Sequence, residues 1–112
     1  MLQAGNYYST KDYQSSIPLL KNILKDQPNN SDVELALANS YLATGSIEEA
    51  ISHCKNVINR KDDLYVDQAR WYLALSYIKQ NKISESKTIL QKLVSDVNAD
   101  FHQEAKTLLN KI

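Results

Sequence analysis

The chain is poor in residues that break helices or cross-link a fold. Only two of its 112 residues are glycine and two are proline, which argues against a loop-rich protein or a β-sheet protein with many tight turns. Cys54 is the only cysteine, so no internal disulfide can form. A single thiol is more typical of reducing compartments, and this favours the cytoplasm over the periplasm.

The chain also lacks an excess of charge and a long apolar run. Thirteen basic residues balance thirteen acidic ones, whereas nucleic-acid binding usually requires a basic excess that displaces counterions from phosphates. No apolar run approaches the roughly 18 residues that a membrane span requires. We therefore expect neither nucleic-acid binding nor direct membrane insertion of this segment. The length fits one small domain, 1–112.

The most informative feature of the chain is an internal repeat. Tyr7, Tyr41 and Tyr77 each precede a polar break and then an amphipathic stretch. The first interval is 34 residues and the second is 36, with the extra two residues most easily placed in the turn at 61–67. Periods of this length are typical of stacked helical repeats.

Each unit is predicted to contain two amphipathic helices. In the second unit the first helix covers roughly 32–44, with Ser31 or Asp32 as its N-cap. Gly45 ends it because glycine adopts the left-handed conformation cheaply. Ser46 then begins a second helix with Glu49 in a capping box. In the third unit the helices cover roughly 69–80 and 83–94, with Asn81 at the stop position.

The two ends of the chain depart from this pattern. The opening helix of the first unit has only about ten residues, which suggests a segment cut from a larger protein or a frayed helix. Pro18 lies in the second turn of the next helix, where proline is tolerated. Residues 99–112 predict a single helix that caps the last repeat. The predicted organisation is a truncated repeat at 1–30, repeats at 31–64 and 65–98, and a cap at 99–112.

These residues resemble the tetratricopeptide repeat, in a bacterial form. The second unit carries the closest match to the family pattern: Leu37, Ala38, Tyr41, Gly45, Ala50, Cys54 and Val57. The sequence departs from the family where an aromatic residue opens each first helix, because Glu34 and Arg70 stand there and Trp71 follows one residue later. The resemblance implies an all-α, right-handed superhelix of about three helix pairs plus a C-terminal capping helix.

Stacked helix pairs of this kind curve, so the first helix of each pair lines a concave face. Helical spacing then predicts a partly apolar groove that binds a protein or peptide partner. Trp71 fits either the core or the groove wall. The predicted lining consists of Tyr8, Leu35, Asn39, Leu42, Gln68, Trp71, Tyr72, Leu75, Ile78 and Lys79.

No pattern in the sequence indicates an enzyme, a cofactor or a metal site. His53 adjoins Cys54, but neighbours on a helix point about 100° apart and cannot pair for catalysis. Glu49 and His53 lie four residues apart, yet two ligands do not make a metal site. We therefore expect a non-enzymatic scaffold. Two alternatives stay open: self-association into a homodimer, and a spacer within a larger, for example membrane-anchored, protein.

Overall fold

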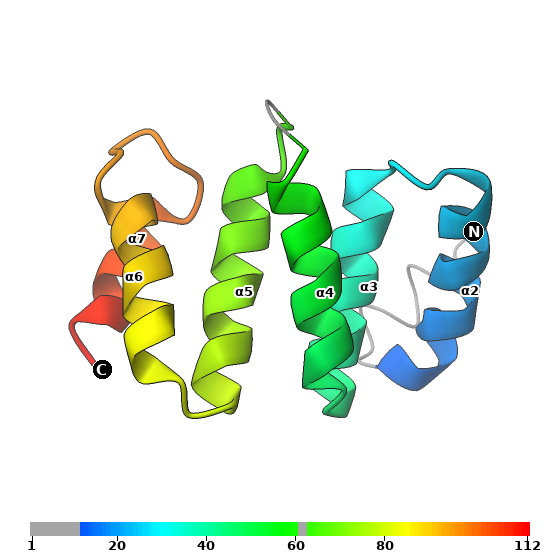
Figure 1. The fold of residues 1–112 in the computed structure, drawn as a ribbon, viewed down its shortest axis with the longest axis horizontal. Helices are drawn as coiled ribbons and strands as arrows, with labels where there is room; N and C mark the ends of the chain where they lie inside the picture. The colour runs from blue at the N-terminus through cyan, green and yellow to red at the C-terminus, as the bar shows by residue number, and fades with distance from the viewer. Residues whose placement is uncertain (1–11, 61–62) are drawn as a thin grey trace.

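The computed structural model describes residues 12–60 and 63–112, and this part of the chain is helical without a strand. The helices stand side by side in chain order, alternating in direction (Figure 1). This confirms the predicted all-α repeat. The helices are α2 (Tyr13–Asp26), α3 (Ser31–Thr44), α4 (Ile47–Ile58), α5 (Val66–Lys79), α6 (Ile83–Val94) and α7 (His102–Leu109).

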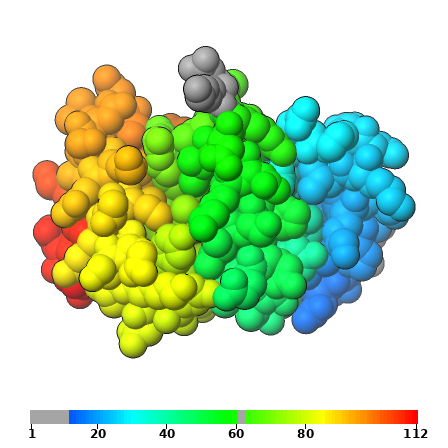
Figure 2. All heavy atoms as spheres, viewed as in Figure 1, coloured from blue at the N-terminus to red at the C-terminus, as the bar shows by residue number. Residues whose placement is uncertain are grey.

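The helices form two layers. Each helix packs against the next one along the chain, and α3 also contacts α5. In Figure 1, α4 lies in front of α3 and α6 lies in front of α7. Figure 2 shows that α4 (green) and α6 (yellow) cover much of the face turned to the viewer. The first helices of the units therefore lie together in one layer, as a solenoid of helix pairs requires.

The predicted stops between paired helices are confirmed. Gly45 has φ 89° and Asn81 has φ 61°, so both adopt the left-handed conformation that ends a helix. The amide of Ser46 donates to the carbonyl of Tyr41 at 2.9 Å, and Lys82 donates to Tyr77 at 2.8 Å. Two of the three tyrosines that define the repeat, Tyr41 and Tyr77, thus accept equivalent hydrogen bonds.

The predicted helix starts were less accurate. Asn30, rather than Ser31 or Asp32, caps α3, and its Oδ1 accepts from the amide of Val33 at 3.1 Å. The capping box at Ser46 does not form, because the Ser46 side chain makes no capping bond. The other half of such a box needs the Ser46 amide as a donor, and the Tyr41 carbonyl already accepts that donor.

Two helices, α5 and α7, also differ from the prediction in where they begin or end. The last helix covers His102–Leu109 only, because residues 97–101 form turns and Phe101 has φ 65°. Helix α5 begins at Val66, three residues earlier than predicted. Pro18 lies inside α2, as predicted. The prediction for the opening helix of the first unit lies outside the described residues.

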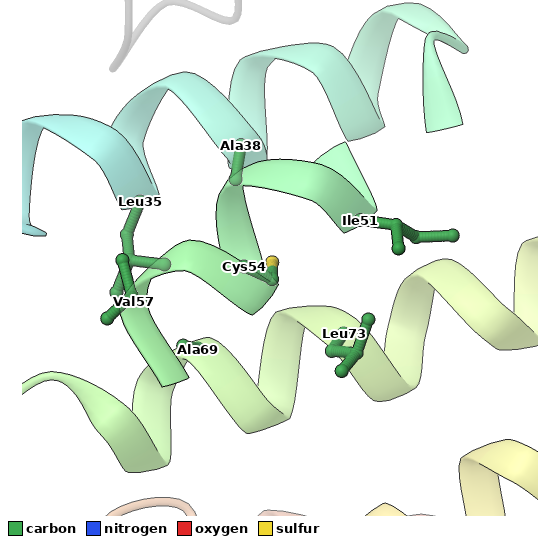
Figure 3. Close-up of a cluster of buried hydrophobic side chains, with 7 residues drawn as sticks. All are labelled: Leu35, Ala38, Ile51, Cys54, Val57, Ala69 and Leu73. Atoms are coloured by element: carbon green, nitrogen blue, oxygen red, sulfur yellow. The ribbon is translucent and has the colours of Figure 1, made fainter. Parts of the chain in front are cut away.

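Two apolar clusters hold the layers together. The first cluster joins α3, α4 and α5. Figure 3 shows its buried side chains on these three helices, among them Leu35, Cys54 and Leu73. The second joins α5, α6 and α7 through Ala74, Leu90, Leu93 and Ala105. Small side chains let the helices approach closely: Ser86, at 0% exposure, donates to the carbonyl of Ala74 at 3.0 Å.

Candidate partner-binding surface

The α3 part of the predicted groove requires a correction. Leu35 is 1% exposed and Leu42 is 6% exposed, so these two leucines belong to the interior and do not line an open groove. Leu35 packs in the cluster that contains Ala69 and Leu73 of α5. Asn39, on the same helix, is half-buried.

On α5 the predicted residues are more accessible. Lys79 is exposed, and Gln68, Trp71, Tyr72, Leu75 and Ile78 are half-buried. Trp71 packs toward the α6–α7 cluster and Tyr72 packs toward the α3–α4 cluster. Tyr8 lies outside the described residues. The α5 side chains are thus at least partly open, whereas Leu35 and Leu42 of α3 are buried.

Trp71 lines an open hollow of about 480 Å³ between α5 and the last helix. Its position is equivalent to that of Leu35, which lies 36 residues earlier, the spacing of Tyr41 and Tyr77. Leu35 of α3 packs in the cluster that includes α5, and Trp71 of α5 packs in the cluster that includes α7. The larger indole, however, extends to the surface. Trp71 therefore contributes both to the apolar core and to the wall of the hollow. The remaining lining comes from Gln103, Glu104, Thr107, Leu108 and Lys111.

None of these five residues was among the predicted groove residues, because residues 99–112 were expected to form a cap on the last repeat. The four polar ones, Gln103, Glu104, Thr107 and Lys111, are exposed. The repeat register could have identified them. Glu104, Leu108 and Lys111 follow Gln68, Tyr72 and Leu75 at an interval of 36 residues, so the last helix takes the place of another first helix.

A second depression, of about 510 Å³, lies beside the N-terminus of α3. Three of its polar side chains already form hydrogen bonds within the fold. Asn30 caps α3, Ser31 donates to Asp63, and Asp63 accepts from the amide of Tyr65 at 2.8 Å. Polar side chains that satisfy one another in this way have little capacity left for a ligand, so we place the candidate surface over Trp71.

A profile of the tetratricopeptide repeat matches residues 7–75, more than half of the chain. The chain belongs to the tetratricopeptide repeat family. A second profile of the same repeat matches residues 68–97. No curated protein matches the chain closely enough to supply a named relative. Tetratricopeptide repeats generally mediate protein–protein interactions, and members of the family are typically non-enzymatic scaffolds.

In this tetratricopeptide repeat domain a buried charge replaces the aromatic residue that usually opens the first helix. Glu34 is 2% exposed. Its carboxylate accepts hydrogen bonds from Nδ1 of His53 at 2.8 Å, from Nδ2 of Asn56 at 2.9 Å and from the guanidinium of Arg60. Arg60 also donates to the carbonyl of Pro28 at 3.0 Å. These contacts join the two helices of the second pair to the preceding turn.

The pKa of Glu34 reflects both its burial and its partners. Burial by itself raises the pKa, but hydrogen bonds from Asn56, His53 and Arg60, together with the positive charge of Arg60, outweigh it and leave the pKa below its ordinary value of 4.5. A carboxyl group whose pKa is lower in the folded state stabilises the fold above its unfolded pKa. That stabilisation is lost as the pH falls through the folded pKa.

We therefore expect an acid-dependent loss of stability that depends on Glu34. The free energy of unfolding of the wild type should fall as the pH drops below about 4.5, and this fall should be smaller in Glu34→Gln, which has no charge to lose there. Urea titrations followed by circular dichroism at a series of pH values measure both curves. Parallel curves for the two proteins would show that Glu34 does not carry the dependence.

Cys54 and His53 both have structural contacts within the domain. Burial, followed by the nearby negative charge of Glu34, raises the pKa of the Cys54 thiol to about 12, so it stays protonated and unreactive at neutral pH. His53 bonds to Glu34 and stacks on Tyr41, with ring centroids 5.8 Å apart. Among the described residues, no three potential ligands gather as a metal site would require, and no helix is long and apolar enough to cross a membrane.

Proposed function

We propose that this tetratricopeptide repeat domain binds a segment of a protein partner on its inner layer, the one formed by the first helices α3 and α5 together with α7, and that the hollow over Trp71 anchors this segment. The observation that supports the proposal is the position of the only tryptophan of the chain, half-buried at the wall of a hollow of about 480 Å³. Tryptophan is enriched among the residues that dominate binding energy. Hollows of roughly 300–1,000 Å³ are the size in which ligand groups are usually enclosed.

The surroundings of Trp71 favour a peptide with a large apolar anchor. Leu108 adds a second apolar contact, while Gln103 and Thr107 offer amide and hydroxyl groups to a peptide backbone. Glu104 on α7 and Lys111, just beyond the end of α7, place charges of opposite sign on the rim of the hollow. An apolar centre with a polar, accessible rim is the usual anatomy of a protein interface. The other inner-layer residues, Asn39, Gln68, Tyr72, Leu75, Ile78 and Lys79, extend this surface across α3 and α5.

A blocking substitution tests the proposal without removing core packing. Peptides are first selected from a random library on the immobilised wild-type domain, and their affinities are measured by calorimetry. Thr107 is exposed at the rim of the hollow, so Thr107→Arg should obstruct the anchor and weaken binding by about tenfold or more. Trp71→Ala should do the same, but it also removes a side chain that packs in the core.

Gln91→Arg is the matched control, because it adds the same charge to an exposed position on α6, outside the hollow. Circular dichroism should show both arginine variants folded. If the selected peptides bind Thr107→Arg as tightly as the control, the anchor lies elsewhere and the proposal fails. Light scattering on the free domain addresses self-association, since a dimer that Thr107→Arg dissociates would identify a second copy as the occupant.

A further inference from the structure

The turn before the last helix contains an unusual backbone conformation. The described chain has three residues with positive φ: Gly45, Asn81 and Phe101. Glycine and asparagine tolerate this region, whereas a bulky side chain adopts it at an energetic cost. A bulky residue persists there only when surrounding contacts favour it, so the contacts of Phe101 require an explanation.

The residues on either side of Phe101 are fixed to two different helices. The amide of Asp100 donates to Oδ2 of Asp67, in the first turn of α5, at 3.2 Å. Nδ1 of His102 donates to the carbonyl of Leu93, near the end of α6, at 3.1 Å. The carbonyl of Phe101 itself accepts from the amide of Ala105 at 2.8 Å and begins the last helix. The backbone of the turn is thus held to both layers of the domain.

This turn places the Phe101 ring against Trp71. The two ring centroids lie 5.5 Å apart and the planes differ by 9°, which is within the range of favourable aromatic stacking. Trp71 lines the hollow, whereas the lining of the hollow does not include Phe101. Phe101 therefore stacks on one face of the indole without lining the hollow itself.

From this geometry we infer that Phe101 is a positioning residue, which holds the indole of Trp71 in the orientation that a partner meets. The consequence for binding rests on the function proposed above. A side chain that is already immobilised loses less conformational entropy when a partner binds. The contact between the Phe101 ring and Trp71 favours the left-handed turn. The stack therefore orients the indole of Trp71 in the free domain, before a partner binds.

The inference can be tested without a partner, because Trp71 is the only tryptophan and all indole fluorescence belongs to it. Time-resolved anisotropy measures fast motion of the indole, and acrylamide quenching measures its accessibility. Phe101→Leu keeps apolar bulk without a ring, and Phe101→Gly removes the ring while relieving the backbone strain. Both variants should lose the immobilised component of the anisotropy and become more readily quenched, whereas Phe101→Tyr should retain the wild-type signals.

Asn81→Gly is the matched control, since it also replaces a positive-φ residue by glycine but lies at the turn between α5 and α6. Its indole signals should equal those of the wild type. Folding of each variant is verified by circular dichroism. Wild-type anisotropy and quenching in both Phe101→Leu and Phe101→Gly would overturn the inference.

A binding measurement separates this inference from the proposed function. Peptides selected on the wild type should bind Phe101→Leu roughly three- to tenfold more weakly, the scale of one aromatic stack. If the indole becomes mobile and Thr107→Arg abolishes binding, but Phe101→Leu binds normally, the positioning role is wrong. If Thr107→Arg also binds normally, it is the proposed binding site that fails, while the fluorescence result still decides whether Phe101 immobilises Trp71.

Discussion

Glu34→Ala is expected to lower the free energy of unfolding by about 3–5 kcal/mol, the cost of leaving a buried ion cluster without one of its members. The substitution removes the acceptor of three side-chain donors, from His53, Asn56 and Arg60. With the carboxylate gone, the guanidinium of Arg60 lacks its counter-charge in a part-buried site, and the methyl group of alanine leaves space that these side chains fill poorly. Urea unfolding at neutral pH, followed by circular dichroism, measures the loss.

Glu49→Ala provides the control for this prediction, because Glu49 is an exposed glutamate on α4. Substitutions at such surface sites usually change stability by no more than about 0.5 kcal/mol. An equally small effect of Glu34→Ala would mean that the buried cluster does not stabilise the domain.

Leu90→Ala is expected to cost about 2–4 kcal/mol through loss of buried apolar surface and formation of a cavity. Leu90 is 0% exposed and lies in the cluster that joins α5, α6 and α7. Because this cluster also supports Trp71, the variant should loosen the wall of the hollow in addition to unfolding more readily. Thermal and urea denaturation measure the change.

The same substitution at Leu64 tests whether burial is the cause. Leu64 is 88% exposed, so Leu64→Ala should leave the free energy of unfolding nearly unchanged. Equal losses at the two leucines would contradict the assignment of Leu90 to the core.

Local signals in the sequence predicted local structure well. Gly45 and Asn81 were identified as helix stops from residue type alone, because few other residues adopt the left-handed conformation without strain. Phe101 breaks that rule, and no local signal marks it. Its ring stacks on Trp71, 30 residues away in the sequence, and a contact of that range leaves no local signal, so the predicted last helix extended through this turn.

The buried cluster around Glu34 could not be predicted from the sequence either. Glu34 appeared only as a departure from the family pattern at the start of a first helix. Its partners lie 19 to 26 residues further along, and glutamate is normally a surface residue. Only the packing of α3 against α4 shows that the charge is buried and that its partners are present.

Residue order was enough to predict a stack of helical hairpins, because hydrophobic periodicity and helix stops depend on residues a few positions apart and recur with the repeat. Which parts of the inner layer are open became visible only in the packing of the helices. Leu35 and Trp71 occupy equivalent positions, yet one is sealed and the other borders a hollow. Exposure depends on the size of a side chain relative to the next helix of the stack, and no periodicity within one helix contains that information.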